Sequence, residues 1–372
     1  MVKKRSKLIL LLVALILFVT GCWDAININD QNFITLVILD KQGEEFSFII
    51  EIPKITPAGS NGGTSGPKVT FVKGRGPSFV KARDSLDEKV DKPLYLGTTR
   101  TLIVTESASK NDLPEYLFRL REDFTYRQKI TLVTTRDDPA VLTEAENENE
   151  TPSGYSIDDN LISLTNNGLT FAKTTASYVE DILSKRGFAV HCICLENKQL
   201  TLVGYSIFRE GKNIGFIPVD DARGLVFMLA EKPVFFYRVP YGEEHATVEV
   251  ELTGKKIILI YQDGAIRFSV QMKFRGDVQY YSQVALFPMD EQKMKEIKQN
   301  LTVVLHEEIK KTIDQSQKEF QSDYLMFCEA FRLAYPNVYD KLDFGQVYPN
   351  VPIEVSTSLD LSISPKMDYD PS

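Results

Sequence analysis

Cysteine and histidine are scarce in this chain of 372 residues, which contains four cysteines and three histidines. Beyond Cys22, the cysteines form an odd set without the spacing of a disulfide framework: Cys192, Cys194 and Cys328. This excludes a scaffold held together by disulfides. The histidines also lack the HExxH pattern and other zinc-ligand spacings: His191, His245 and His306. No metal cofactor is therefore predicted.

Motifs for nucleotide binding and for nucleophilic catalysis are also missing. Gly74-Arg75-Gly76 begins like a dinucleotide-binding turn, but Phe79 stands where the third glycine is required. We interpret it as a strand-to-helix turn whose helix opens at Pro77. Gly204-Tyr205-Ser206 lacks the second glycine of a GxSxG nucleophile motif, and Gly254-Lys255 lacks the rest of a P-loop. The sequence predicts neither an enzyme nor a cofactor.

Basic residues are outnumbered by acidic ones. The chain has 43 Lys and Arg against 51 Asp and Glu, a formal net charge of −8 at pH 7. Residues 1–21 contain four Lys and Arg and no acid, so the charge of the remainder falls by four to −12. A chain this acidic is a poor partner for nucleic acid or anionic headgroups, and no nucleic-acid partner is predicted.

Two clusters of polar residues contain the donor atoms that a metal or redox site would need. In a strand, Cys192 and Cys194 point to one face and His191 to the other, so the three do not share a metal without a bend. We interpret both cysteines as small buried hydrophobes. An acidic run contains alternate glutamates that suit calcium: Glu144, Glu146, Glu148 and Glu150. No glycine turn or bidentate spacing organises them, so a solvated loop is the better interpretation.

The leader, residues 1–21, has the pattern of a bacterial signal peptide. Four basic residues precede the unbroken apolar run from Leu8 to Val19, and the small residues Thr20 and Gly21 follow. A transmembrane helix needs about 20 apolar residues, so this run is too short to anchor the protein by itself. Val19-Thr20-Gly21-Cys22 resembles a lipobox, whose cysteine carries a diacylglyceryl group and becomes the first residue of the mature chain.

We therefore predict that Cys22 is an N-palmitoyl, S-diacylglycerol cysteine that tethers the protein to a membrane. Such a double anchor holds a protein stably, which a single acyl chain does not. The alternative is an ordinary secretory signal in which Cys22 is incidental.

Apolar periodicity predicts an N-terminal α/β domain over residues 22–196. The expected strands are 33–39, 46–55, 69–72, 101–105 and 130–134. The expected helices are 77–90, 113–122, 155–166 and 174–185. A Gly- and Ser-rich stretch at 58–67 predicts a flexible loop. A middle α/β module is expected at 197–242, with strands at 201–209, 213–218 and 234–239 around a short helix at 220–230.

The remainder, residues 243–372, is predicted to be an α+β domain. Three strands at 246–252, 256–261 and 266–274 are joined by expected turns at Thr253-Gly254 and Asp263-Gly264, which gives an antiparallel meander. A long helix at 290–320 carries one apolar stripe that is expected to pack across the meander. A helix at 323–334 and a strand at 351–364 follow. The predicted whole is a three-domain extracytoplasmic lipoprotein of mixed α/β and α+β class.

Several short motifs together resemble one family, the Ger(x)C lipoproteins, which are the C subunits of spore germinant receptors in spore-forming Firmicutes. The N-terminal motifs are Gly21-Cys22-Trp23-Asp24 and Leu39-Asp40-Lys41. The middle motifs are Ser206-Ile207-Phe208-Arg209, Lys212, Ile214-Gly215 and Ala222-Arg223-Gly224-Leu225. The late motifs are Gln317-Lys318-Glu319-Phe320, Ser322-Asp323 and Pro336. Departures from the family pattern, which suggest a divergent member, are Ile38, Met326, Cys328 and Ser364-Pro365.

The resemblance implies a non-catalytic subunit on the extracytoplasmic face of the spore inner membrane. Its implied partners are two integral membrane subunits, of A and B type, in a receptor that senses nutrients and starts germination. Whether this subunit contacts a germinant directly is left open. The alternative function is a solute-binding lipoprotein of a transporter, which needs a cleft between two similar lobes.

Overall fold

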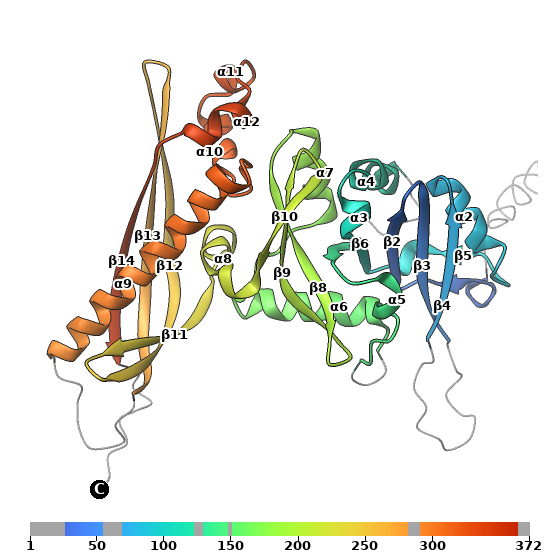
Figure 1. Ribbon diagram of the computed structural model, residues 1–372, viewed down its shortest axis with the longest axis horizontal. Helices are drawn as coiled ribbons and strands as arrows, with labels where there is room; N and C mark the ends of the chain where they lie inside the picture. Colours follow the sequence, from blue (N-terminus) through green and yellow to red (C-terminus); the bar gives the residue numbers. More distant parts are fainter. Residues whose placement is uncertain (1–26, 55–68, 123–128, 148–150, 282–290, 364–372) are drawn as a thin grey trace, which may run out of the picture.

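The computed structural model describes residues 27–54, 69–122, 129–147, 151–281 and 291–363. The predicted leader, Cys22 and the expected loop at 58–67 lie outside these residues. Two large sheets dominate the fold, and Figure 1 shows them at opposite ends of the long axis. The class is mixed α/β and α+β, as the sequence predicts.

The first sheet has eight strands in the order β10-β9-β8-β7-β6-β2-β3-β4. Their bounds are β2 Leu36–Gln42, β3 Glu45–Pro53, β4 Val69–Gly76, β6 Thr101–Thr105, β7 Thr131–Thr135, β8 Phe188–Glu196, β9 Gln199–Arg209 and β10 Lys212–Pro218. The central strands β2, β6, β7 and β8 run parallel, whereas the outer pairings are antiparallel. Parallel strands are covered on both faces, which explains continuous apolar runs such as Leu102 to Val104.

Helices cover both faces of this sheet. On one face lie α2 Phe79–Asp87, α4 Leu113–Glu122 and α7 Thr175–Leu183, whose apolar residues join one core cluster. On the other face lie α5 Pro139–Leu142 and α6 Ser153–Asn166, whose apolar residues join a second core cluster. Short elements complete this part: β1 Asn32–Phe33, β5 Leu94–Tyr95 and α3 Glu106–Ser109.

The predicted turn at Gly74-Arg75-Gly76 is wrong, because these residues are the last three of β4. Helix α2 begins at Phe79 rather than Pro77, with Ser78 as its N-cap. The glycines serve helix packing instead. A Cβ on Gly74 would lie 2.3 Å from the Ala82 carbonyl oxygen, and one on Gly76 would lie 2.6 Å from the Ala82 nitrogen. Only glycine lets α2 lie this close to the strand.

The second sheet has four strands in the order β11-β12-β13-β14. Their bounds are β11 Val234–Tyr241, β12 Glu244–Gln262, β13 Ala265–Tyr281 and β14 Ile353–Ile363. Helix α9, Glu291–Asp314, packs across it and continues into a π-helical turn, Gln315–Glu319. The predicted stripe is confirmed, since its central residues are fully buried against the sheet: Ile297, Leu301, Leu305 and Ile309.

The expected turn at Thr253-Gly254 is wrong. Strand β12 runs unbroken for 19 residues through these positions, and the pairing with β13 only shifts register between Leu252 and Gly254. A glycine inside a strand marks such a β-bulge as readily as a turn. The turn at Asp263-Gly264 is confirmed, with positive φ angles of 52° and 80° that suit a two-residue hairpin.

The strands of residues 197–242, the expected middle module, belong to two different sheets. Strands β9 and β10 extend the eight-stranded sheet, whereas β11 begins the four-stranded one. Between them, helix α8, Arg223–Leu229, packs against α9. The expected boundaries at 196/197 and 242/243 thus fall within hairpins. Alternating apolar residues locate strands but do not assign them to a sheet, and a separate middle module stays a prediction.

Candidate functional site

The junction between the two sheets contains most of the family-like motifs of the middle and late sequence. Gly215 of β10 lies against Phe320, where an added Cβ would be 2.4 Å from the ring. Gly224 of α8 lies against α9, where a Cβ would be 2.4 Å from the Glu308 carbonyl oxygen. Both glycines therefore permit contacts closer than any side chain allows.

Polar side chains after α9 fix the chain at the same junction. Gln317 donates from Nε2 to the carbonyl oxygens of Tyr348 and Val351, both at 2.8 Å. Ser322 Oγ donates to the Phe208 carbonyl of β9 at 2.9 Å. The Asp323 carboxylate accepts the backbone N–H groups that begin α10, Phe327–Ala334. Burial raises the pKa of Asp323, and these N–H groups oppose that rise.

A buried arginine links the first part of the chain to α10. The Arg186 side chain is 6% exposed and contacts Glu329 of α10 and Glu180 of α7 at 3.0 Å each, with Asp181 at 3.6 Å. Burial by itself would lower the pKa of Arg186, but the carboxylates of Glu329 and Asp181 raise it overall. The arginine therefore stays charged and joins elements on both sides of the junction.

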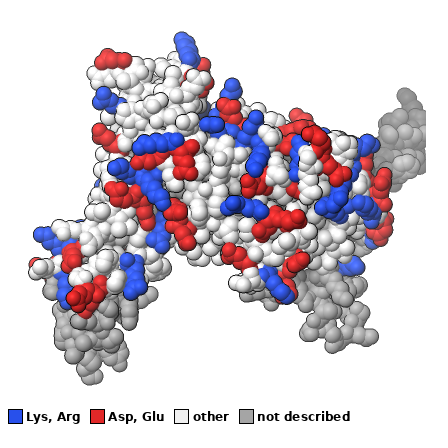
Figure 2. Space-filling view, in the orientation of Figure 1, with Lys and Arg blue, Asp and Glu red and all other residues white. Residues whose placement is uncertain are grey.

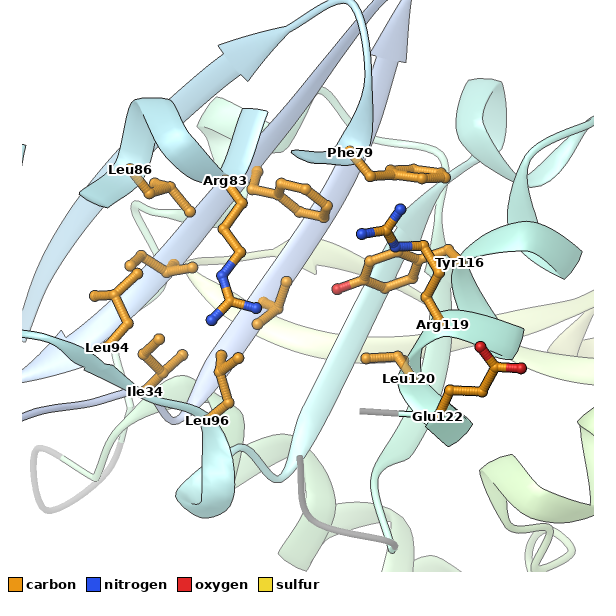
Figure 3. Close-up of a pocket in the computed structure, with 13 residues that line it drawn as sticks. Ile34, Phe79, Arg83, Leu86, Leu94, Leu96, Tyr116, Arg119, Leu120 and Glu122 are labelled. Carbon is orange, nitrogen blue, oxygen red and sulfur yellow. The ribbon is translucent and has the colours of Figure 1, made fainter. Parts of the chain in front are cut away.

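A cavity of about 380 Å³ opens between α2 and α4, on the face of the eight-stranded sheet that these helices and α7 cover (Figure 3). Apolar side chains from the sheet, α2 and the β5 region form its walls, including Ile34, Leu86, Leu94 and Leu96. Two arginines and a glutamate also line it: Arg83, Arg119 and Glu122. It has the apolar walls and few polar groups typical of small-molecule sites.

The predicted separation of His191 from the cysteines agrees with the contacts of these residues. His191 Nε2 and Thr170 Oγ1 hydrogen-bond at 2.9 Å, and the His191 ring packs 4.8 Å from that of Phe171. Cys192 is buried and hydrogen-bonds Cys194, which raises the pKa of Cys192 and lowers that of Cys194 to about 7. Within the described ranges all three cysteines are free, and no group of three potential ligands is placed to hold a metal.

His191 gives the fold a pH dependence. Burial lowers its folded-state pKa to about 4, against 6.5 for an ordinary histidine. Between these pH values the unfolded chain binds a proton that the folded chain does not. Stability is therefore complete above pH 6.5 and falls as the pH drops toward 4, by about 3 kcal/mol at most. Urea unfolding at pH 7 and pH 4.5 measures this loss.

The matched control for this prediction is His191→Gln, which keeps a hydrogen-bonding partner for Thr170 but does not titrate. We expect the variant to be less stable at pH 7 and to have a flatter profile between pH 4.5 and 6.5. An equal loss of stability in both proteins over this interval would contradict the assignment to His191.

The remaining sequence-predicted site residues lie largely outside the described chain. Cys22, Glu148 and Glu150 are among them, whereas Glu146 pairs with Lys198 at 2.5 Å. Figure 2 shows Lys and Arg interspersed with Asp and Glu over the face in view. No described helix has the length and apolar character needed to cross a membrane.

Comparison with known proteins first defines the fold. A solved structure titled "Crystal Structure of the GerBC protein" superposes with a TM-score of 0.57, covering 87% of this chain and 96% of that one at 14% identity. The two sheets with α9 across the second therefore form the same fold as the GerBC protein.

Family models and relatives then identify the family. Residues 24–193 match the model described as "Spore germination protein N-terminal domain", and residues 203–363 match "Spore germination B3/ GerAC like, C-terminal". Spore germination protein KC of Bacillus subtilis (strain 168) is 23% identical over 95% of this chain and 94% of its own. Spore germination protein B3 of the same organism is 19% identical over 88% of this chain and 89% of its own. This chain belongs to the Ger(x)C family, the C subunits of germinant receptors.

Neither the pocket nor the arginine bridge was found by sequence reasoning. The pocket residues come from separate elements at irregular spacing, so no motif marks them. Arg186 follows Lys185 at the end of α7 and has the sequence context of an ordinary basic helix end.

Proposed function

We propose that this protein is a lipid-anchored, non-catalytic subunit of a nutrient germinant receptor in the spore inner membrane. It acts by docking against and stabilising two integral membrane subunits of A and B type. The observation that carries the proposal is the family match across both halves of the chain, residues 24–193 and 203–363. The lipobox-like residues before Cys22 support the anchor.

The anchor constrains which end of the protein faces the membrane. Asn27, the first described residue, is five residues after Cys22, and five residues span at most about 18 Å. The short β1 and β5 pair, and the β2 to β4 part of the eight-stranded sheet next to it, therefore lie near the membrane surface. Figure 1 shows the four-stranded sheet at the other end of the long axis, far from the anchored end.

This arrangement suits a structural subunit. A lipid tether holds the protein at high effective concentration beside its membrane partners, so modest contacts suffice for stable assembly. The bridge through Arg186 and the hydrogen bond from Ser322 to β9 favour a fixed placement of the two sheets. A rigid body near the membrane can support partners without any chemistry of its own.

The solute-binding alternative is less well supported. It requires two similar lobes that close over a ligand. The two sheets here have eight and four strands, and the helices pack on them differently. Helices lie on both faces of the first sheet, whereas α9 crosses the second. The cavity described above lies within the first of these units rather than in a cleft between similar lobes.

The test is a deletion of this chain in its source organism. We expect dormant spores without it to lose the germination response to at least one nutrient, measured by the fall in optical density, and to regain it when the intact chain is restored. Germination by a non-nutrient trigger is the control and should be unchanged. An unaltered response to all nutrients tested, singly and in combination, would contradict the proposal.

A further inference from the structure

We propose that a groove near the lipidated end of the chain binds the headgroup of an anionic phospholipid. The groove has a volume of about 870 Å³. It lies between the end of β3, the start of β4, the N-terminal segment 29–33 and the segment 89–92, which joins α2 to β5. The proposal rests on the lipid anchor of the proposed function, which brings the groove to a membrane, and adds a second contact with that membrane.

The groove lies within reach of the anchor. Asn29, which lines it, is seven residues after Cys22, and seven residues span at most about 25 Å. Figure 1 shows β3, β4 and β5 together at the end of the long axis opposite the four-stranded sheet. A tether of this length keeps bilayer headgroups at a high effective concentration beside the groove. Phospholipid is therefore the anion that the groove meets most often.

Three lysines give the groove its charge. Lys54, Lys89 and Lys92 line it and are exposed. One acidic residue also lines it, Asp91, whose Oδ1 accepts a hydrogen bond from Asn32 at 3.3 Å. The lining therefore has a net charge of three minus one, or +2, which matches the negative charge of a phosphate headgroup.

Two of these lysines are held in position by backbone groups. Lys89 Nζ donates to the Lys73 carbonyl oxygen at 2.6 Å, and Lys92 Nζ donates to the Asn29 carbonyl oxygen at 2.8 Å. A carbonyl group is neutral and an ammonium group has three N–H donors, so both lysines keep their charge and further donors for phosphate oxygens. Side chains that are already positioned lose less entropy when a ligand binds.

The rest of the lining suits the glycerol part of a phospholipid. Phe33, Ile52 and Val72 are half-buried apolar residues of the groove, and Gln31 and Thr70 supply polar groups beside them. A phospholipid joins an anionic phosphate to a glycerol with apolar chains. A lining with both lysines and apolar side chains therefore fits a lipid better than a free phosphate ion.

The groove is a local exception to the acidity of the chain. The chain after residue 21 has a net charge of −12, which opposes its approach to an anionic surface. Two nearby acids, Asp87 and Glu88, do not line the groove. Salt screens exposed charges beyond about 10 Å, so only a face that presents lysines is drawn to the headgroups. We expect the groove to orient the tethered protein, whereas the acyl groups anchor it.

Vesicle flotation tests the proposal on the mature chain, residues 22–372, carrying Cys22→Ala, which has no acyl group. The probes are vesicles of phosphatidylcholine alone and of phosphatidylcholine mixed with phosphatidylglycerol, at low ionic strength. We expect binding to the mixed vesicles only, and less of it as salt is added. Lys89→Gln and Lys92→Gln should each weaken binding about fivefold, which is the contribution of one lysine near an anionic surface.

Lys54→Gln should weaken binding by the same factor. Lys54 is exposed just after the end of β3, so this variant keeps the test valid if either of the others disturbs the fold. The matched control is Lys256→Gln, which removes the same charge from an exposed position of β12, at the other end of the long axis (Figure 1). The control should bind like the parent.

Three results would overturn the proposal. The first is an absence of binding to the mixed vesicles, or equal binding to both kinds. The second is a loss in the control equal to that in the groove variants, which would reflect net charge alone. The third is saturable binding of soluble glycerol 3-phosphate without vesicle binding, which would assign the groove to a free phosphate. None of these results bears on the anchor at Cys22, which membrane fractionation tests separately.

Discussion

Replacing Cys22 with alanine is expected to move the protein from the membrane fraction of broken spores to the soluble fraction. The leader alone is too short to anchor the chain, and no described helix is suited to cross a membrane. Two acyl signals give stable anchoring, and their loss removes most of the binding free energy. Ultracentrifugation with immunodetection measures the distribution of the protein.

Cys194→Ala is the control, because it also removes a cysteine but leaves the anchor. Cys194 is half-buried in β8, so its loss should not move the protein between fractions. The circular dichroism spectrum of the Cys22→Ala protein should match that of the chain whose leader has been removed. Continued membrane association of the Cys22→Ala protein after high-salt washing would contradict lipid anchoring.

Replacing Arg186 with glutamine is expected to destabilise the fold by about 3 kcal/mol and to weaken the link between the two sheets. Removing one partner of a buried ion pair typically costs about 3–5 kcal/mol, because the remaining charges lose their compensation. Asp181 stays paired with Lys173, and Glu180 reaches solvent, which places the loss at the lower end of that range. Chemical unfolding monitored by intrinsic fluorescence measures the change.

Arg332→Gln is the matched control for this substitution. Arg332 contacts the same carboxylate, Glu329, at 2.6 Å, but it is an exposed neighbour on the same helix. An exposed pair contributes little to stability, so this variant should unfold close to the parent. Equal effects of the two substitutions would show that Arg186 does not join the two parts of the protein.

Local structure was predicted well wherever the pattern of apolar residues determined it. The strand at 101–105 and the helix at 113–122 have the predicted bounds, and the stripe on α9 is buried. The errors concern glycines. Gly254 marks a bulge rather than a turn, and Gly74 marks a close helix contact. A glycine in a sequence indicates a backbone without a side chain, but the neighbouring element that requires this is known only from the fold.

The same limit applies to the candidate sites, whose residues can be read from the sequence but whose contacts follow from the fold. Gly224 belongs to a family-like motif in the sequence, and the structure shows that it lies against α9. The bridge made by Arg186 could not be predicted, since its partner Glu329 is 143 residues away in the sequence. Charge pairs of this kind follow from the tertiary arrangement and leave no periodic signal.

Affinity isolation from detergent-solubilised spore membranes tests the central claim most directly. The tagged protein, expressed from its own locus, would be isolated and its companions identified by mass spectrometry, with an untagged strain as control. The account predicts recovery of two polytopic membrane proteins. Recovery of an ATP-driven transporter instead, or of no membrane protein under conditions that keep other membrane complexes intact, would contradict it.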